Sequence, residues 1–256
     1  MLTPVILGLP GTGKSALTLA LAELLGFGVF RSDPFFRACR ELPATSSDPR
    51  RQIAERFAAR VTLQYPELSD AAATDVNALN ANGLCVLHDG KRFRDRFGET
   101  VFRLFEIEML AWAQEAGVIG RDLPDLSASA PLFEDNRRRF SRQAGYYPVL
   151  IDLPMRVIAA RVVADYESFV AARRAGRPIT IRGYYEAALD RVVAAADDEK
   201  SRSAALAAEA MRLTAEAAEK RMAAYRDYAE MVFRPPPGAT PREIAVELLP
   251  HVARAN

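Results

Sequence analysis

Short apolar runs and helical periodicity alternate over the first thirty residues of the chain. Residues 5–7 form an apolar run that leads directly into Gly8, as expected of a buried strand. Lys14–Leu25 repeats apolar residues at helical spacing and stops at Gly26, and residues 28–30 indicate a second strand. Strand, glycine-rich loop, helix and strand in this order predict an α/β fold with a parallel sheet.

The same pattern continues along the rest of the chain. Residues 123–128, 149–153 and 231–234 predict three more strands, which gives a sheet of about five. Helical stretches are expected at residues 50–80 with a break at Tyr65-Pro66, at 97–114, from Pro154, at 197–231 and from Pro241. Helices on both faces of the sheet would make a three-layer sandwich formed by one domain over residues 1–256.

The stretch at residues 197–231 is rich in alanine and contains neither glycine nor proline, which predicts one long helix. Its alanine-rich face could pack on its own domain or pair with a partner chain. Both alternatives stay open on the sequence, so a monomer or a homodimer is expected.

Composition and charge exclude several classes of protein. Half of the residues are hydrophobic and the formal net charge is +1, so we expect a globular protein without a general attraction to nucleic acid or membranes. We see neither a signal peptide nor a transmembrane span and expect a cytoplasmic location. The two cysteines, Cys39 and Cys85, match no metal-ligand spacing and are interpreted as reduced thiols.

The segment from Gly8 to Ser15 satisfies the pattern G-x-x-x-x-G-K-[ST] in full. Glycines let successive backbone N–H groups point at phosphate oxygens, and the helix that follows adds its positive end. Lys14 would reach the β- and γ-phosphates of ATP, and the Ser15 hydroxyl would bind Mg²⁺. The predicted nucleotide-binding residues are Pro10, Gly11, Thr12, Gly13, Lys14, Ser15 and Ala16.

Asp33 is the candidate for chemistry at the acceptor. It ends the second expected strand, and the carboxyl ends of parallel strands face the ligand crevice. Its carboxylate could accept the proton of an attacking hydroxyl or hold Mg²⁺ through water. The alternative is that Asp33 only caps a helix begun by Pro34.

Arginines supply the candidate anion-binding groups. Arg103 lies near the edge of an apolar helix face, where it could hold a carboxylate with two hydrogen bonds, or form a surface salt bridge to Glu99 or Glu106. Further arginines surround a break at residues 176–178, as in a mobile loop that closes over ATP, although a solvated basic loop would look the same. These are Arg173, Arg174, Arg177 and Arg182.

Several motifs together resemble the shikimate kinase family. They are the first strand with its phosphate loop, the phrase Ser32-Asp33, the phrase Phe97-x-Glu99-x-x-Phe102-Arg103-x-x-Glu106 with Gly98 inside it, the pair Arg177-Pro178, and Arg221 with Tyr225. The resemblance implies a P-loop kinase fold in which Asp33 binds the acceptor hydroxyl and serves as the base. It further implies that Arg103 and Arg221 hold the substrate carboxylate, and that Arg177 reaches the phosphates from a lid.

The chain departs from that family in three places. Arg31 stands where the family has an additional aspartate, and Ser127-Ala128-Ser129-Ala130-Pro131 stands where the family has three glycines. Side chains at the second place should narrow or reshape the acceptor pocket, because only glycine leaves backbone open to a ligand. The third departure is length: a mostly helical insertion is expected at residues 43–96 on the substrate side, and an enlarged lid at 165–200.

These observations predict an ATP- and Mg²⁺-dependent kinase that phosphorylates a hydroxyl of a small, carboxylate-bearing metabolite. The catalytic residues would be Lys14, Asp33 and Arg177. Two alternatives remain: an ATP-binding regulatory relative without turnover, and a P-loop kinase for another acceptor such as a nucleotide-sugar.

Overall fold

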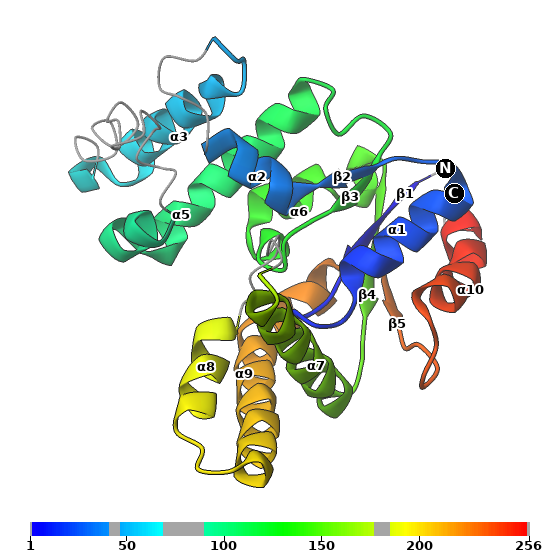
Figure 1. Ribbon diagram of the computed structural model, residues 1–256. Helices are drawn as coiled ribbons and strands as arrows, with labels where there is room; N and C mark the ends of the chain where they lie inside the picture. The colour runs from blue at the N-terminus through cyan, green and yellow to red at the C-terminus, as the bar shows by residue number, and fades with distance from the viewer. Residues whose placement is uncertain (1, 41–46, 69–89, 177–184, 255–256) are drawn as a thin grey trace. The chain divides into compact units, whose positions relative to one another are not determined.

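The structure is a computed structural model that describes residues 2–40, 47–68, 90–176 and 185–254. The chain divides into two compact units. Unit 1 comprises Met1–Gly26 and Phe140–Asn256, and unit 2 comprises Phe27–Arg139. Each unit contains a parallel sheet of its own with helices packed around it (Figure 1).

The sheet of unit 1 has three strands in the order β1-β4-β5. These are β1 (Thr3–Leu7), β4 (Tyr146–Ile151) and β5 (Met231–Phe233), and all of them run parallel. Val149 of the central strand pairs with Ile6 on one side and with Met231 on the other. β1 and β4 are almost wholly buried, which explains why both appear in the sequence as continuous apolar runs rather than alternating ones.

Of the helices described in unit 1, α1 (Lys14–Leu25) packs on β1 and α9 (Glu199–Tyr228) on β4, and the others pack on these two helices (Figure 1). α10 (Pro241–Arg254) packs against α1, and α7 (Met155–Arg174) and α8 (Glu186–Ala194) pack against α9. The alanine-rich stretch is thus one long helix that packs on its own chain. A short 3₁₀ turn, η4 (Arg142–Ala144), precedes β4.

Unit 2 pairs two short strands, β2 (Val29–Arg31) and β3 (Leu123–Asp125), in parallel. Its main helices are α2 (Ser32–Arg40), α3 (Arg51–Gln64), α5 (Gly90–Glu115) and α6 (Glu134–Arg139), with 3₁₀ turns η1 (Pro66–Leu68) and η3 (Ala130–Leu132). α3 packs on α5 through the fully buried Phe57, whose ring centroid lies 5.7 Å from that of Phe105. Arg60 adds an ion pair to Glu108 at 2.7 Å.

The structure confirms the α/β fold class and finds a strand at each of the five predicted places. The expected single sheet of about five strands is wrong, because the strands of the described residues form one sheet of three and another of two. An apolar run shows that a strand exists but does not reveal which strand it hydrogen-bonds with. The domain, insertion and lid boundaries remain predictions, and residues 69–89 and 177–184 lie outside the described part.

The helix expected at residues 97–114 also differs from its prediction. α5 begins earlier, at Gly90, and is interrupted at Gly98, whose φ of 80° and ψ of 165° are not helical. A φ of this sign is accessible to glycine at little cost, because glycine has no Cβ. The part after Gly98 carries the buried residues expected to face the core, including Val101, Phe105 and Met109.

Candidate functional site

The glycine-rich loop joins β1 to α1 and has the backbone conformation that its sequence requires. Gly11 and Gly13 have φ values of 85° and 83°, in the left-handed region. A Cβ on Gly11 would lie only 3.0 Å from Cγ2 of Val162. Gly13 is the N-cap of α1, and because glycine has no side chain, no cap side chain covers the first-turn N–H groups.

Hydrogen bonds inside the loop gather around the carbonyl oxygen of Leu9. It accepts from the Thr12 N–H at 3.1 Å, from Thr12 Oγ1 at 2.8 Å and from Lys14 Nζ at 3.4 Å. The Lys14 ammonium group is therefore folded over the loop. Ser15 and Ala16 are exposed at the start of α1.

These residues fit a nucleoside triphosphate with Mg²⁺. The loop offers backbone N–H groups, a helix N-terminus, an ammonium group and an exposed hydroxyl, which are the groups that bind phosphate oxygens and their metal. The described residues contain no cluster of three or more His, Cys, Asp or Glu side chains that could hold a metal by themselves. Mg²⁺ keeps several waters and binds through few protein ligands, so a single hydroxyl such as that of Ser15 fits it.

Arg221 lies on the buried face of α9 in unit 1. Only 7% of the residue is exposed, and Tyr225, one helical turn further on, is fully buried. Arginine is rarely buried to this degree, since removing its charge from water is costly unless the charge is paired. Its burial distinguishes Arg221 from the solvent-exposed arginines of the chain.

The arginines expected in the lid are only partly described. Arg173, at the end of α7, forms ion pairs with Glu186 at 3.8 Å and Asp190 at 3.5 Å on α8. It therefore links two helices. Arg177 lies outside the described residues, and its predicted role stays a prediction.

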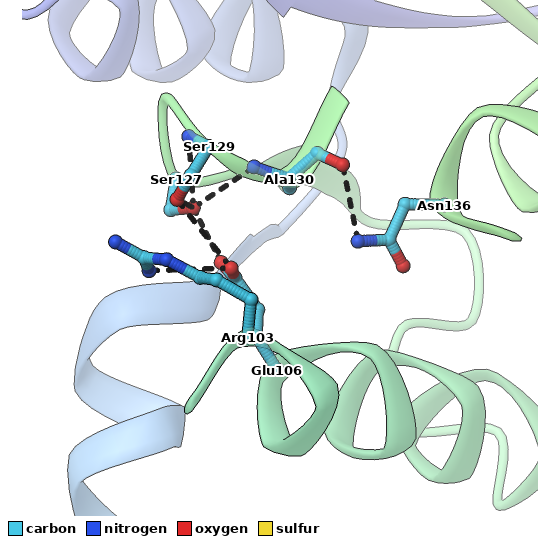
Figure 2. A network of polar contacts seen from close by, with 6 residues as sticks. All are labelled: Arg103, Glu106, Ser127, Ser129, Ala130 and Asn136. Carbon is cyan, nitrogen blue, oxygen red and sulfur yellow. Dashed lines mark hydrogen bonds and ion pairs between the residues drawn. The ribbon is translucent and has the colours of Figure 1, made fainter. Parts of the chain in front are cut away.

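In unit 2, a buried carboxylate organises the residues that follow β3 (Figure 2). Arg103 and Glu106 are three residues apart on α5, and Arg103 Nη1 lies 3.4 Å from Glu106 Oε2. Ser127 Oγ donates a short hydrogen bond to Glu106 Oε1, and Ser129 Oγ lies 3.5 Å from Glu106 Oε2. We call these four residues the Glu106 cluster.

The burial of the Arg103–Glu106 contact excludes one of the two interpretations of Arg103, the surface salt bridge. The side chains of Arg103 and Glu106 are 15% and 4% exposed, so this is not the surface salt bridge that was one alternative. Burial raises the pKa of Glu106, while the positive charge of Arg103 and the Ser127 hydrogen bond lower it. The negative charge of Asp33 acts on Glu106 as well and raises its pKa.

Asp33 lies in the first turn of α2 and is exposed. β2 ends at Arg31 and α2 begins at Ser32, so the helix starts two residues before the expected position at Pro34. A carboxylate in a first turn is stabilised by the helix dipole. The structure thus places an ionisable carboxylate near Glu106 in unit 2, and its role as a base remains a prediction.

Among solved structures, the chain is similar to shikimate kinases. The crystal structure of shikimate kinase from Bacteroides thetaiotaomicron has a TM-score of 0.52 and 17% identity, covering 99% of this chain and 99% of that one. A shikimate kinase from Acinetobacter baumannii in complex with shikimate has a TM-score of 0.46 and 17% identity, covering 100% and 96%. No family model and no curated protein matches the sequence.

The chain has a shikimate kinase-like P-loop kinase fold. At this level of identity the similarity establishes the fold, and the resemblance found in the sequence motifs is confirmed to that extent. Among the described residues, no helix has both the length and the apolar character needed to cross a membrane.

Within this fold, sequence reasoning missed Arg161. Its Nη1 on α7 donates a hydrogen bond to the Thr12 carbonyl oxygen at 3.0 Å. The same nitrogen would lie 3.4 Å from a Cβ on Gly13. A lone arginine between the buried Ile158 and Val162 was the available signal, but its partner is 149 positions away in the chain.

Asp125 was also missed, and it changes the interpretation of Arg31. These residues face each other in the parallel register of β2 and β3, and Arg31 Nε lies 3.9 Å from Asp125 Oδ2. The position where the family has an acid is basic here, but a carboxylate from the neighbouring strand lies beside it.

Proposed function

We propose that this chain is an ATP-dependent kinase that transfers the γ-phosphoryl group to a hydroxyl of a small, carboxylate-bearing metabolite. The observation that carries the proposal is the glycine-rich loop. Its two left-handed glycines and Lys14 at the first position of α1 would form a phosphate cradle within a P-loop kinase fold.

Unit 1 would bind the nucleotide. The N–H groups of residues 11–16 would hold the phosphates, and Lys14 would move from the Leu9 carbonyl oxygen to the β- and γ-phosphates. Mg²⁺, when bound, would neutralise charge on the phosphates, and Ser15 would be its ligand in unit 1. The water-mediated role of Asp33 rests on the sequence alone. Arg177 would stabilise charge on the transferring group.

Unit 2 would bind the acceptor. Asp33 would take the proton of the acceptor hydroxyl as its oxygen attacks the γ-phosphorus and the bond to the β-phosphate oxygen breaks. Arg103 would hold the acceptor carboxylate through the part of its guanidinium that is exposed. The role of Arg221 as a second carboxylate ligand is implied by the motif resemblance alone. Support for an acidic acceptor comes from these two arginines.

The proposal is tested by an ATP-consumption screen against hydroxy acids, including shikimate, and against nucleotide-sugars. We expect turnover with at least one hydroxy acid, a loss of at least about a hundredfold in Asp33→Asn, and no loss in Asp227→Asn, an exposed aspartate on α9. ATP binding without turnover on any acceptor would indicate a regulatory ATP-binding protein. Turnover confined to nucleotide-sugars would contradict the proposal that the acceptor is a small, carboxylate-bearing metabolite.

A further inference from the structure

We propose that Ser127 and Ser129 are positioning residues for the acceptor: they hold Glu106 so that its carboxylate orients Arg103 toward an anionic group. The inference rests on the proposed function, because it concerns the arginine that would bind the acceptor carboxylate. It differs from the sequence expectation, in which this segment reshapes the pocket by direct contact.

The first support is the direction in which the hydroxyl groups point. Figure 2 shows the loop of Ser127 and Ser129 above the end of the Glu106 side chain, with Arg103 beside the same carboxylate. Ser127 contacts Oε1, whereas Ser129 and Arg103 contact Oε2. Because both oxygens are engaged, the carboxylate has one orientation, and the planar guanidinium that pairs with it is fixed too.

The second support is the number of hydrogen bonds made by Ser127 Oγ. It accepts from the Ser129 N–H at 3.3 Å and from the Ala130 N–H at 3.2 Å. A hydroxyl has one proton and two acceptor lone pairs, so the proton of Ser127 is directed to Glu106. A protonated Glu106 would find both lone pairs already in use, which means that this serine favours the ionised carboxylate.

The loop that carries the serines is fixed in turn. The buried Asn136 of α6 donates from Nδ2 to the Ala130 carbonyl oxygen at 3.1 Å. Ser129 Oγ lies 3.0 Å from Ser127 Oγ, whose two lone pairs are already in use, and it reaches Glu106 Oε2 only at 3.5 Å. Ser129 is therefore the weaker of the two supports.

Opposing influences on Glu106 make this support necessary. Burial and the charge of Asp33 from α2 raise its pKa, and Arg103 from α5 and Ser127 from the loop lower it. If the Ser127 hydrogen bond is lost, Glu106 should take up a proton at a higher pH. A neutral Glu106 no longer orients Arg103 through an ion pair, so binding of an acidic acceptor should weaken as the pH falls.

The test uses the full chain and two independent measurements. The first follows the ¹³C side-chain resonance of Glu106 through a pH titration, in the wild type and in Ser127→Ala, Ser129→Ala and Ser127→Thr. The second measures KM and kcat for the hydroxy acid phosphorylated in the screen, and for ATP. Ser203→Ala, an exposed serine on α9, is the matched control, and a thermal melt of each variant checks folding.

We expect Ser127→Ala to shift the titration of Glu106 to higher pH and to raise the acceptor KM about tenfold near neutral pH, with the KM for ATP unchanged. Ser129→Ala should shift the titration of Glu106 in the same direction and raise the acceptor KM about two- to threefold. Ser127→Thr, which keeps the hydroxyl, should restore the wild-type values, and Ser203→Ala should match the wild type.

Other outcomes separate this proposal from the proposed function. A shifted Glu106 titration with an unchanged acceptor KM would overturn the positioning role and leave the kinase assignment standing. Equal changes in the KM values for ATP and acceptor would also overturn it, because they would indicate a general structural defect. If no hydroxy acid is phosphorylated, the proposal of an acidic acceptor is wrong. The positioning role of the serines is then wrong as well, whatever the titration of Glu106 shows.

Discussion

The glycine-rich loop of unit 1 and the Glu106 cluster of unit 2 are built in different ways. The loop relies on backbone: two left-handed glycines, an uncovered helix N-terminus and a carbonyl oxygen that collects three hydrogen bonds. The cluster relies on side chains, with Arg103 and Glu106 on α5 and Ser127 and Ser129 in the loop that follows β3. A site made from backbone tolerates few substitutions, whereas a site made from side chains can be altered residue by residue.

The sharpest test of the loop is Lys14→Ala. It removes the only side-chain charge in the loop segment from Gly8 to Ser15, so kcat should fall by a factor of about a hundred to a thousand, while the melting temperature changes little. The measurement is steady-state ATP turnover with the acceptor found in the screen. Lys200→Ala, an exposed lysine on α9, is the matched control, and wild-type turnover in Lys14→Ala would contradict the phosphate role of the loop.

Gly11→Ala tests whether backbone conformation is what the loop depends on. The added Cβ would meet Val162 Cγ2 at 3.0 Å at a φ of 85°, so we expect a loss of about 2–3 kcal/mol in the free energy of unfolding, measured by urea denaturation.

Gly26→Ala is the matched control for that substitution. Its φ of 68° is also left-handed, but nothing lies within 4 Å of the added Cβ. It should cost only about 1 kcal/mol. Equal losses in the two variants would show that crowding against α7 contributes nothing.

Arg161→Ala tests the hydrogen bond that α7 makes to the loop. Without its hydrogen bond to the Thr12 carbonyl oxygen, the loop should be less ordered, and the Kd for ATP should rise about five- to tenfold. Calorimetric titration with a non-hydrolysable ATP analogue measures this. Arg156→Ala, an exposed arginine on the same helix, should bind like the wild type. An unchanged Kd in Arg161→Ala would leave the loop as a site of backbone alone.

The smallest expected effect is a pH dependence of stability from Glu106. Its pKa is raised in the folded state above the usual 4.5, mainly by burial. Between the unfolded and folded pKa values the folded state binds more protons, so the free energy of unfolding falls as the pH rises through this window. In Glu106→Gln, whose side chain cannot ionise, the contribution of residue 106 to the pH dependence of the free energy of unfolding should disappear. An identical slope in urea denaturation of both proteins from pH 4 upward would contradict the burial of an ionisable Glu106.

Local signals in the sequence were sufficient for much of the fold. α1 has the predicted bounds because Gly13 and Gly26 mark its two ends, and the strands of the described residues lie where the sequence predicted them. The pairing of those strands was not predictable in the same way, since it depends on residues far apart in the chain. Gly98 was visible within its motif, but the interruption it makes in α5 required the backbone angles.

In the candidate site too, residues that are close in the sequence were predictable, and contacts between distant residues were not. The loop residues are consecutive, so the motif predicted them all. Glu106 was named in the motif and as a possible surface partner of Arg103, but its contacts with Ser127 and Ser129 were missed, because these serines are 21 and 23 positions away from it. Arg177 was predicted from its motif and lies outside the described residues.

The ion pair between Arg31 and Asp125 has a consequence for the fidelity of folding. β2 and β3 have three residues each, so few hydrogen bonds distinguish their correct register from a shifted one. A slip by one residue would place the arginine beside Pro124 or Leu126, which are both buried and apolar. The charge pair thereby selects against misaligned pairing, and it fixes the strand ends from which Asp33 and Ser127 continue.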